Sequence, residues 1–418
     1  MTRVRSLMLL AMLFVAAARL GGQTPMVPAP RSALTVTLVT FGQGEEVFER
    51  FGHDALWFHD DATGMDTAYH WGLFDFNEPH FVARFVSGDT HYSMGGEYAV
   101  AMIDRERRTG RTVTLQRLNL APAQAAALLA FVRWNALEEN RYYRYDYFRD
   151  NCATRLRDAL DGALGGMLKA RFDTARTTLS YRSESVRLTD GDRPAQLGID
   201  LALGQPADRH LTVWESFFIP MRFRDALRGV QVATSTGGVV PLVAQEMQLP
   251  VLPGTPHIDE IPDAPSLVLR YLFVGVILAA VVVGLRVMMV TRRSAAWGLA
   301  LFAAGWNLVC GVVGVLISLA WFATRHVFWA RNENLLLLSP FCLALVLLVP
   351  MALLSFRAER AARNTAWVVA ALGLLAALLA IIPGGQRNGA IVALLLPAHL
   401  ALAWALSRAP AAPPVTAS

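Results

Sequence analysis

The sequence predicts an α+β domain outside the cytoplasm, followed by an all-α bundle of about five transmembrane helices. The last third of the 418 residues holds long apolar runs, and such runs are typical of membrane-spanning helices. Residues 1–22 combine Arg3 and Arg5 with an apolar stretch and small residues, the pattern of a signal peptide or N-terminal anchor. The segment between these two regions is therefore expected to leave the cytoplasm.

The membrane domain is predicted over residues 263–410. The loops after its first and third hydrophobic stretches carry more arginines than the alternate loops. Because short cytoplasmic loops collect lysine and arginine, this bias places the C-terminus inside and the N-terminal domain outside. The fourth stretch is the shortest of the five. Each approaches the roughly 20 residues that cross a bilayer, and the five cover residues 267–290, 297–322, 335–356, 366–382 and 389–407.

The first half of the exported domain is rich in predicted strands. LTVTLVTFG contains many β-branched residues and predicts a strand. A β-hairpin follows, with HDALWFHD as its first arm, the turn DDATGMDT, and TAYHWGLFDF as its second arm. His53 lies on the first arm and His70 on the second. Two more strands are predicted in THYSMGGEYAVAMID and GRTVTLQRLNL.

Two helices follow, and then a segment that is harder to interpret. APAQAAALLAFVRWNALEEN has apolar residues at helical spacing, and NCATRLRDALDGAL begins after a cap at Asp150 or Asn151. Residues 181–262 are expected to form an extension and a proline-rich tether, with SYRSESVRLTD as a loop and PLVAQEMQLPVLP as part of the tether. LTVWESFFIPMRFRDALRGV is either an interfacial helix on lipid or an ordinary surface helix.

The cysteines single out one thiol. Cys310 and Cys342 fall within predicted membrane helices, so Cys152 has no disulfide partner in the exported domain. At the first turn of a helix, unpaired N–H groups and the positive end of the helix dipole favour a thiolate and stabilise an oxyanion. Cys152 is therefore a candidate nucleophile, and a small buried hydrophobic residue is the alternative.

His53 is a candidate base for this thiol and His70 a candidate residue to orient it, which would give a Cys-His-His triad. His59 and His91 are alternative bases, and Asp75 is an alternative to His70. No metal-binding or phosphate-binding motif occurs, so the sequence implies no metal and no cofactor. The net charge of +5 suits anionic lipid, since an exported domain meets no nucleic acid.

The order FGHDALWF, YHWG and DNCATRLRDAL resembles the circularly permuted papain-like fold of the lecithin–retinol acyltransferase type. With YHWGLFDF, RYDYFRDNCATRLRD and a following membrane region, the chain resembles the Lnb family of bacterial lipoprotein N-acyltransferases over about residues 35–180. LTVWESFFIPMRF and WARNENLLLLSP also resemble that family. The resemblance implies a papain-like catalytic domain at residues 33–180, on the periplasmic side of the bacterial inner membrane.

The resemblance also implies roles for individual residues, with Cys152 as nucleophile, His53 as base and His70 as third polar residue. The implied reaction moves a fatty acyl chain from a phospholipid, through a cysteine thioester, to the α-amino group of a diacylglyceryl-cysteine lipoprotein. A Cys-His phospholipase or peptidase and a catalytically dead membrane sensor are the alternatives. Asn332 and Asn334 are expected to bond the catalytic domain or substrate. The candidate substrate contacts are Arg144, Arg149, Arg155, Arg182, Tyr147 and Asn151.

Overall fold

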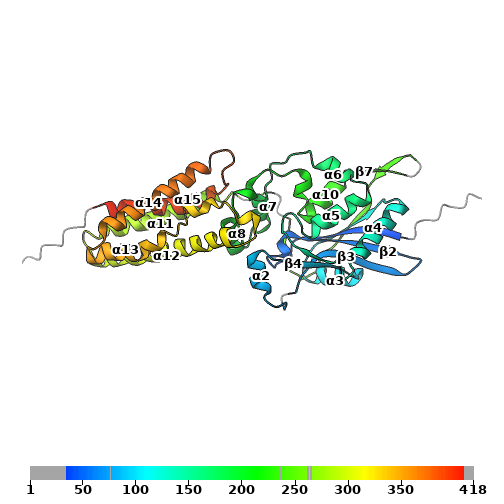
Figure 1. Ribbon diagram of the computed structural model, residues 1–418, viewed down its shortest axis with the longest axis horizontal. Coiled ribbons are helices and arrows are strands. Elements are labelled where there is room, and N and C mark those ends of the chain that lie inside the picture. The colour runs from blue at the N-terminus through cyan, green and yellow to red at the C-terminus, as the bar shows by residue number, and fades with distance from the viewer. Residues whose placement is uncertain (1–33, 76, 235–236, 261–262, 264–265, 409–418) are drawn as a thin grey trace, which may run out of the picture.

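The computed structural model describes residues 34–408, apart from residues 76, 235–236, 261–262 and 264–265. The predicted signal segment lies outside the described residues. Figure 1 shows a mixed α/β domain and a bundle of helices arranged end to end. The predicted fold class, an α+β domain followed by a helical membrane region, is confirmed.

The N-terminal domain is built on a seven-stranded antiparallel sheet with the order β6-β4-β3-β2-β1-β5-β9. The predicted first strand and the predicted hairpin are present as β1, β2 and β3. The strands of the sheet are β1 Leu34–Phe41, β2 His53–Asp60, β3 Met65–Leu73, β4 His91–Tyr98, β5 Val113–Leu118, β6 Tyr142–Arg144 and β9 Val243–Leu249.

Helices cover both faces of this sheet. The predicted helices are present as α4, Pro122–Asn135, and α5, Cys152–Ala163, and they share a core with Leu56 and Phe58 of β2. On the other face, α3 packs against Ala55 of β2. Successive residues of a strand point to opposite faces, so even-numbered residues of β2 face α5 and odd-numbered residues face α3.

Three predictions about the exported domain are wrong. The stretch AVAMID is helical, because α3, Ala99–Arg108, spaces Ala99, Met102 and Ile103 along one buried face. The predicted loop SYRSESVRLTD forms α7, Tyr181–Leu188, whose first turn is capped by the side chain of Ser180. Part of the predicted tether is β9, which pairs with β5 at the edge of the sheet.

The segment LTVWESFFIPMRF is buried in the domain. Its helices are α9, Val213–Ser216, and α10, Pro220–Leu227, and their neighbour Phe217 is 1 % exposed. It is therefore neither a lipid-lying helix nor an ordinary surface helix. The remaining elements of the domain are η1 Glu49–Phe51, α2 Phe81–Ser87, α6 Met167–Phe172, α8 Arg193–Ala202, η2 Gln205–Asp208, β7 Gln231–Ala233 and β8 Val239–Pro241.

Four helices of the described chain are long and apolar enough to cross a membrane. The predicted span at residues 335–356 instead forms a short helix of 14 residues, α13, which is about 21 Å long and falls short of the roughly 30 Å hydrocarbon core. The described chain therefore has four long candidate spans and not the predicted five, and the shortest stretch is the third and not the fourth. The long helices are α11 Val268–Met288, α12 Arg293–Ala323, α14 Glu359–Leu379 and α15 Gly389–Ser407; the short one is α13 Cys342–Ser355.

The irregular backbone before α13 is enclosed by protein. It includes η4, Glu333–Leu336, and the buried residues Leu337, Leu338 and Ser339. Non-helical backbone at membrane depth is tolerated only where protein or a water-filled cavity surrounds it. The loops between α11 and α12 and between α13 and α14, which carry the arginine surplus, lie at the bundle end away from the sheet domain (Figure 1).

Candidate active site

Cys152 is the first residue of α5 and is 9 % exposed. The preceding residue fixes this helix start: Asn151 Oδ1 accepts the Thr154 N–H at 2.9 Å, and Thr154 Oγ1 accepts the Asn151 N–H at 2.8 Å. Asn151 Nδ2 donates to the carbonyl oxygens of Tyr147 and Phe218. These bonds occupy the Asn151 side chain, so it positions the thiol and is not available to substrate.

The thiol lies where β2 and β3 separate. Regular pairing of these strands runs only from Asp60 to Leu56 on β2, so the ladder is open toward His53. Gly72 has a φ of +90°, and a Cβ there would lie 3.4 Å from the Cβ of Cys152. The left-handed backbone therefore favours glycine here, while a Cβ would make only ordinary contact with Cys152. On the other side, the Asp54 main-chain N–H donates to the sulfur.

Burial, together with the charge of Asp54, raises the pKa of the Cys152 thiol to about 12. Hydrogen bonds from the N–H groups of Ala153 and Asp54 act in the opposite direction but are outweighed. The expectation that the helix start gives a resting thiolate is thus wrong, because desolvation disfavours the charged form of a buried group. Cys152 rests as a neutral thiol and needs a base.

A chain of polar side chains lies on the α3 face of the sheet. His53 Nε2 is 2.9 Å from His70 Nδ1, and His70 Nε2 is 3.3 Å from Glu97 Oε1. Arg105 donates to both oxygens of Glu97, at 2.7 and 2.8 Å. The two predicted histidines are thus brought together, and Glu97 and Arg105 extend the chain. Sequence reasoning missed Glu97, although it lies on β4 opposite Ala68, two residues from His70.

The electrostatics of this chain keep His53 neutral. Burial lowers the pKa of His53 well below its ordinary value, and the charges of His70 and Arg111 lower it further. Hydrogen bonds from Arg105 and His70 lower the pKa of Glu97 to about 2. A neutral His53 is able to accept a proton, and since Nε2 is bonded to His70, Nδ1 is the nitrogen left for it.

The thiol and His53 are close along the backbone but lie on opposite faces of β2. Cys152 belongs to the core beneath α4 and α5, while His53 stacks on Phe41 in the core beneath α3. The connection between them is Asp54, which follows His53 and donates its amide to the sulfur. No hydrogen bond joins the thiol to an imidazole in the described part of the chain, so contact requires a side-chain movement.

Asp54 is a second residue that sequence reasoning missed. It is fully buried, its Oδ1 accepts the Thr40 hydroxyl at 2.7 Å, and its Oδ2 has no partner among the described residues. Burial raises the pKa of Asp54 to about 7. The available signal was the alternation of the strand, which turns the residue after His53 toward α5.

The alternative bases and the alternative orienting residue lie elsewhere. His59 bonds Asp61 at the turn of the hairpin, and His91 is an exposed neighbour of Asp89. Asp75 is exposed and accepts the side chain of Asn77. None of these three described side chains bonds His53, His70 or Cys152.

Three candidate substrate contacts surround the start of α5. Arg155 donates to both oxygens of Asp150 and stacks over the Tyr143 ring at 3.7 Å. Arg149 is exposed, and its guanidinium lies 4.7 Å from the centre of the Phe328 ring. Tyr147 stacks on His326, and its buried hydroxyl has no partner within the described residues. Of the two arginines, Arg149 therefore keeps the more accessible cation.

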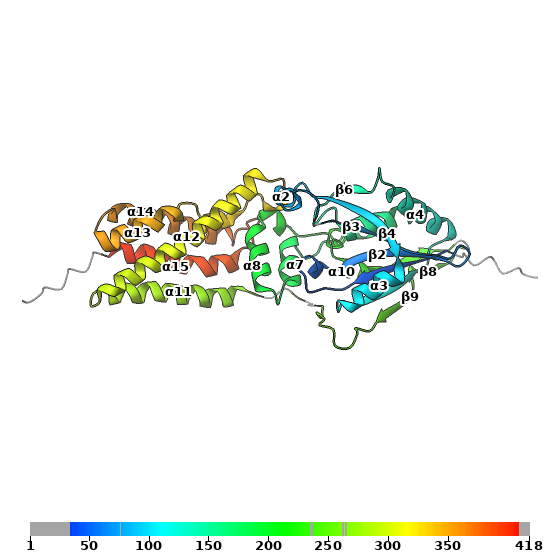
Figure 2. The same cartoon turned by 90° about the horizontal axis from the view of Figure 1, so that it is seen from below.

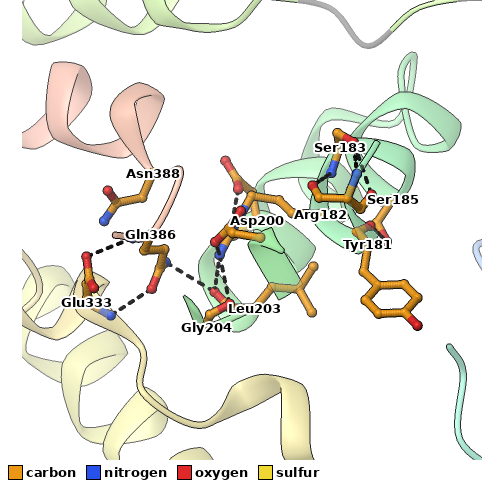
Figure 3. Close-up of polar contacts among 12 residues, drawn as sticks. Tyr181, Arg182, Ser183, Ser185, Asp200, Leu203, Gly204, Glu333, Gln386 and Asn388 are labelled. Atoms are coloured by element: carbon orange, nitrogen blue, oxygen red, sulfur yellow. Dashed lines mark hydrogen bonds and ion pairs between the residues drawn. The ribbon is translucent and has the colours of Figure 1, made fainter. Parts of the chain in front are cut away.

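Arg182 does not belong to the site. Its buried guanidinium donates to Asp208 at 2.8 Å, to Asp200 at 2.7 Å and to the carbonyl oxygens of Leu203 and Gly204. Figure 3 shows this cluster next to Gln386 of the bundle. The expectation of a phosphate contact is corrected here, because protein oxygens occupy the guanidinium.

The same region joins the α/β domain to the bundle. Gln386 donates to the carbonyl oxygen of Leu203 at 3.2 Å and exchanges main-chain to side-chain bonds with Glu333 (Figure 3). Asn332 and Asn334 donate to the carbonyl oxygen of Leu201 at 2.8 and 3.2 Å. Leu201 belongs to α8, in the segment predicted as the extension, so these asparagines bond that segment and not the predicted catalytic domain at residues 33–180.

Residues 29–181 match the family model described as the Lnb N-terminal periplasmic domain, so the chain is consistent with an Lnb-type protein. The resemblance read from the motifs is confirmed over that range. No curated protein and no solved structure matches the chain significantly. Together with the four candidate spans, the match indicates a multi-pass membrane protein with a periplasmic domain.

Proposed function

We propose that the protein is a lipoprotein N-acyltransferase of the bacterial inner membrane, with Cys152 as nucleophile, His53 as base and His70 as the residue that orients His53. One observation carries the proposal: a buried thiol at a helix start lies one main-chain amide away from a neutral histidine, within an Lnb-type domain. Family membership supports an enzyme with a lipoprotein-modifying role.

The position of the thiol relative to the bundle supports lipid substrates. Phe148, four residues before Cys152, packs on Phe328 with ring centres 4.8 Å apart. Phe328 belongs to η3, Val327–Trp329, in the connection between α12 and α13. The start of α5 is therefore at the membrane-proximal end of the domain, where a phospholipid ester and the lipid-anchored N-terminus of a lipoprotein are both within reach.

In the first half-reaction, Sγ of Cys152 attacks the carbonyl carbon of the phospholipid ester while His53 Nδ1 takes the thiol proton. The main-chain N–H of Cys152, the first residue of α5, stabilises the oxyanion that forms, since the N–H groups of Ala153 and Thr154 are bonded to the sulfur and to Asn151. The carbon–oxygen bond then breaks, and the departing lysophospholipid oxygen receives the proton from His53. A thioester on Cys152 is left.

In the second half-reaction, the α-amino group of the diacylglyceryl-cysteine attacks the thioester carbonyl and gives a proton to His53. The carbon–sulfur bond breaks, the sulfur regains a proton, and an N-acyl amide is released. Glu97 stabilises each protonated state of the histidine pair through His70, which it meets at 3.3 Å. Burial of the thiol excludes water and thereby favours the amine over hydrolysis.

The test expresses wild-type protein and Cys152→Ser in a strain depleted of its own N-acyltransferase, and reads a lipoprotein N-terminal peptide by mass spectrometry. We expect an N-acyl chain with the wild type only, and an acyl-enzyme on Cys152 that neutral hydroxylamine releases. Absence of N-acylation by folded wild-type protein contradicts the proposal. Lysophospholipid release without an acylated amine assigns the site to a phospholipase instead.

A further inference from the structure

Helix α2 presents an apolar surface beside the membrane bundle. Val82, Val86 and Phe85 are 69, 51 and 38 % exposed. The three residues are spaced three and four apart, so they share one face of the helix. The position of α2 in the molecule indicates what binds to this face.

α2 lies where α12 leaves the membrane. The Arg325 N–H donates to the Ser87 carbonyl oxygen at 2.9 Å, and the His326 ring bonds the Phe85 carbonyl oxygen at 2.9 Å. Arg325 and His326 directly follow α12, a candidate membrane span that ends at Ala323. Figures 1 and 2 place α2 between the bundle and the sheet. Its exposed side chains are thus at the level of the lipid surface.

A row of aromatic rings leads inward from α2. Ring centres are separated by 6.3 Å from Phe85 to Phe81, 5.7 Å from Phe81 to Phe74, 5.1 Å from Phe74 to Tyr92 and 4.2 Å from Tyr92 to Tyr145. Exposure falls from 38 % at Phe85 to 7 % at Tyr92, and the last ring, Tyr145, is half-buried. The row therefore passes from the lipid surface into the domain.

The inner end of the row reaches the nucleophile. A Cβ on Gly72 would lie 4.0 Å from Cε2 of Tyr145 and 3.4 Å from the Cβ of Cys152. At the outer end, Arg144 donates to the carbonyl oxygens of Gly88 and Arg325, and the Arg325 side chain is 70 % exposed and lies 3.9 Å from Asp89 Oδ1. Aromatic rings inside and cations at the rim match an acyl chain and its phosphate headgroup.

We propose that α2 and this row, Phe85, Phe81, Phe74, Tyr92 and Tyr145, form the binding site for the acyl chain of the donor phospholipid and direct its ester to Cys152. The inference rests on the proposed function for the identity of the donor. The site itself is tested without turnover.

The experiment uses full-length Cys152→Ala in vesicles of phosphatidylethanolamine and phosphatidylglycerol that contain a phospholipid with a diazirine in one acyl chain. After irradiation, labelled peptides are identified by mass spectrometry, with labels on α11 as the internal reference for bulk lipid. We expect labels at Phe74–Tyr92, and Val82→Asp should lower them at least 5-fold. Val239→Asp, at a valine of similar exposure (67 %) on β8, is the matched control and should leave them unchanged.

A second arm measures the acyl-enzyme in proteins that retain Cys152. Val82→Asp should slow thioester formation from phospholipid at least 10-fold, but not from water-soluble p-nitrophenyl acetate, which also reports correct folding. Labels confined to the bundle overturn the proposal. Labels at Phe131 in place of Phe74–Tyr92 also overturn it, because Phe131 lines a separate cavity of about 470 Å³ between α4 and α5. If the expected labels appear but the wild-type protein does not N-acylate a lipoprotein, the acyl-chain site is supported and the proposed reaction is contradicted.

Discussion

Two buried polar networks of this protein differ in how completely their groups are bonded. At the junction with the bundle, Arg182 meets Asp200, Asp208 and main-chain oxygens with every guanidinium nitrogen. At the Cys152 site, Asp54 Oδ2 has no partner among the described residues. Complete bonding of the Arg182 guanidinium fits a cluster that holds the structure together, although Asn388 Oδ1 at the same junction has no partner among the described residues.

The difference has an energetic meaning. A buried polar group without a partner costs about 1–3 kcal/mol, so the unpaired Asp54 oxygen lowers stability, whereas the bonds of Arg182 offset the cost of burying its charge. Substitutions at the Cys152 site should mainly change reaction rate or pH dependence, whereas a substitution in the Arg182 cluster should mainly lower stability.

His53→Gln removes the proton acceptor and should lower the rate of acyl-enzyme formation by about 10²–10⁴-fold, with little effect on thermal unfolding. The rate is measured by mass spectrometry of Cys152 after mixing with phospholipid. His59→Gln, in the exposed hairpin turn, is the control and should keep the wild-type rate. Equal losses in both variants would remove His53 from the mechanism.

Arg182→Met leaves Asp200 and Asp208 buried without their cation and should cost about 3–5 kcal/mol of stability. Unfolding in detergent is followed by circular dichroism. Arg209→Met is the control, because its pair with Glu215 is partly exposed and is worth about 1 kcal/mol or less. A stable Arg182→Met protein would show that the junction does not depend on this cluster.

Asp54→Asn should flatten the dependence of stability on pH. Because the folded-state pKa of Asp54 is raised from 3.8 to about 7, the folded protein binds the proton more tightly than the unfolded chain. Stability is therefore lost as pH rises between these values, by about 4 kcal/mol at most.

Unfolding of wild type and Asp54→Asn at pH 5 and pH 8 measures this loss. Since the charge of Asp54 raises the pKa of Cys152, the thiol of the variant should also react faster with iodoacetamide at pH 8. An unchanged pH dependence would contradict the assignment. Asp61→Asn, in the exposed hairpin turn, is the control.

Glu97→Gln should give the smallest effect, about a 10-fold loss of rate, because Glu97 acts on His53 through His70. Its charge raises the pKa of His53, so its removal should shift the acid limb of the pH–rate profile to lower pH. The profile is measured from pH 4.5 to pH 8 for Glu97→Gln and Glu97→Asp, and the conservative variant should recover most of the rate. An unshifted profile would leave Glu97 a structural role only.

Local pattern was enough to predict much of the fold. Alternation and β-branched residues predicted β1, β2 and β3, and a cap at Asp150 or Asn151, of which Asn151 is the actual cap, predicted the start of α5. The failures lie where long-range contacts decide. SYRSESVRLTD is polar by composition, yet its Arg187 and Glu184 pair inside the protein, and β9 becomes a strand because β5 offers an open edge.

By itself, the sequence determined the candidate nucleophile, the pair of histidines and the division into an exported domain and a membrane bundle, since these depend on residue type, spacing and hydropathy. Only the tertiary structure decided that Cys152 rests as a thiol, that Glu97 completes the chain from His53, and that Arg182 binds protein rather than lipid. Each of these depends on burial and on partners distant in the sequence. Desolvation and charge pairing are properties of the packed chain, and local sequence does not contain them.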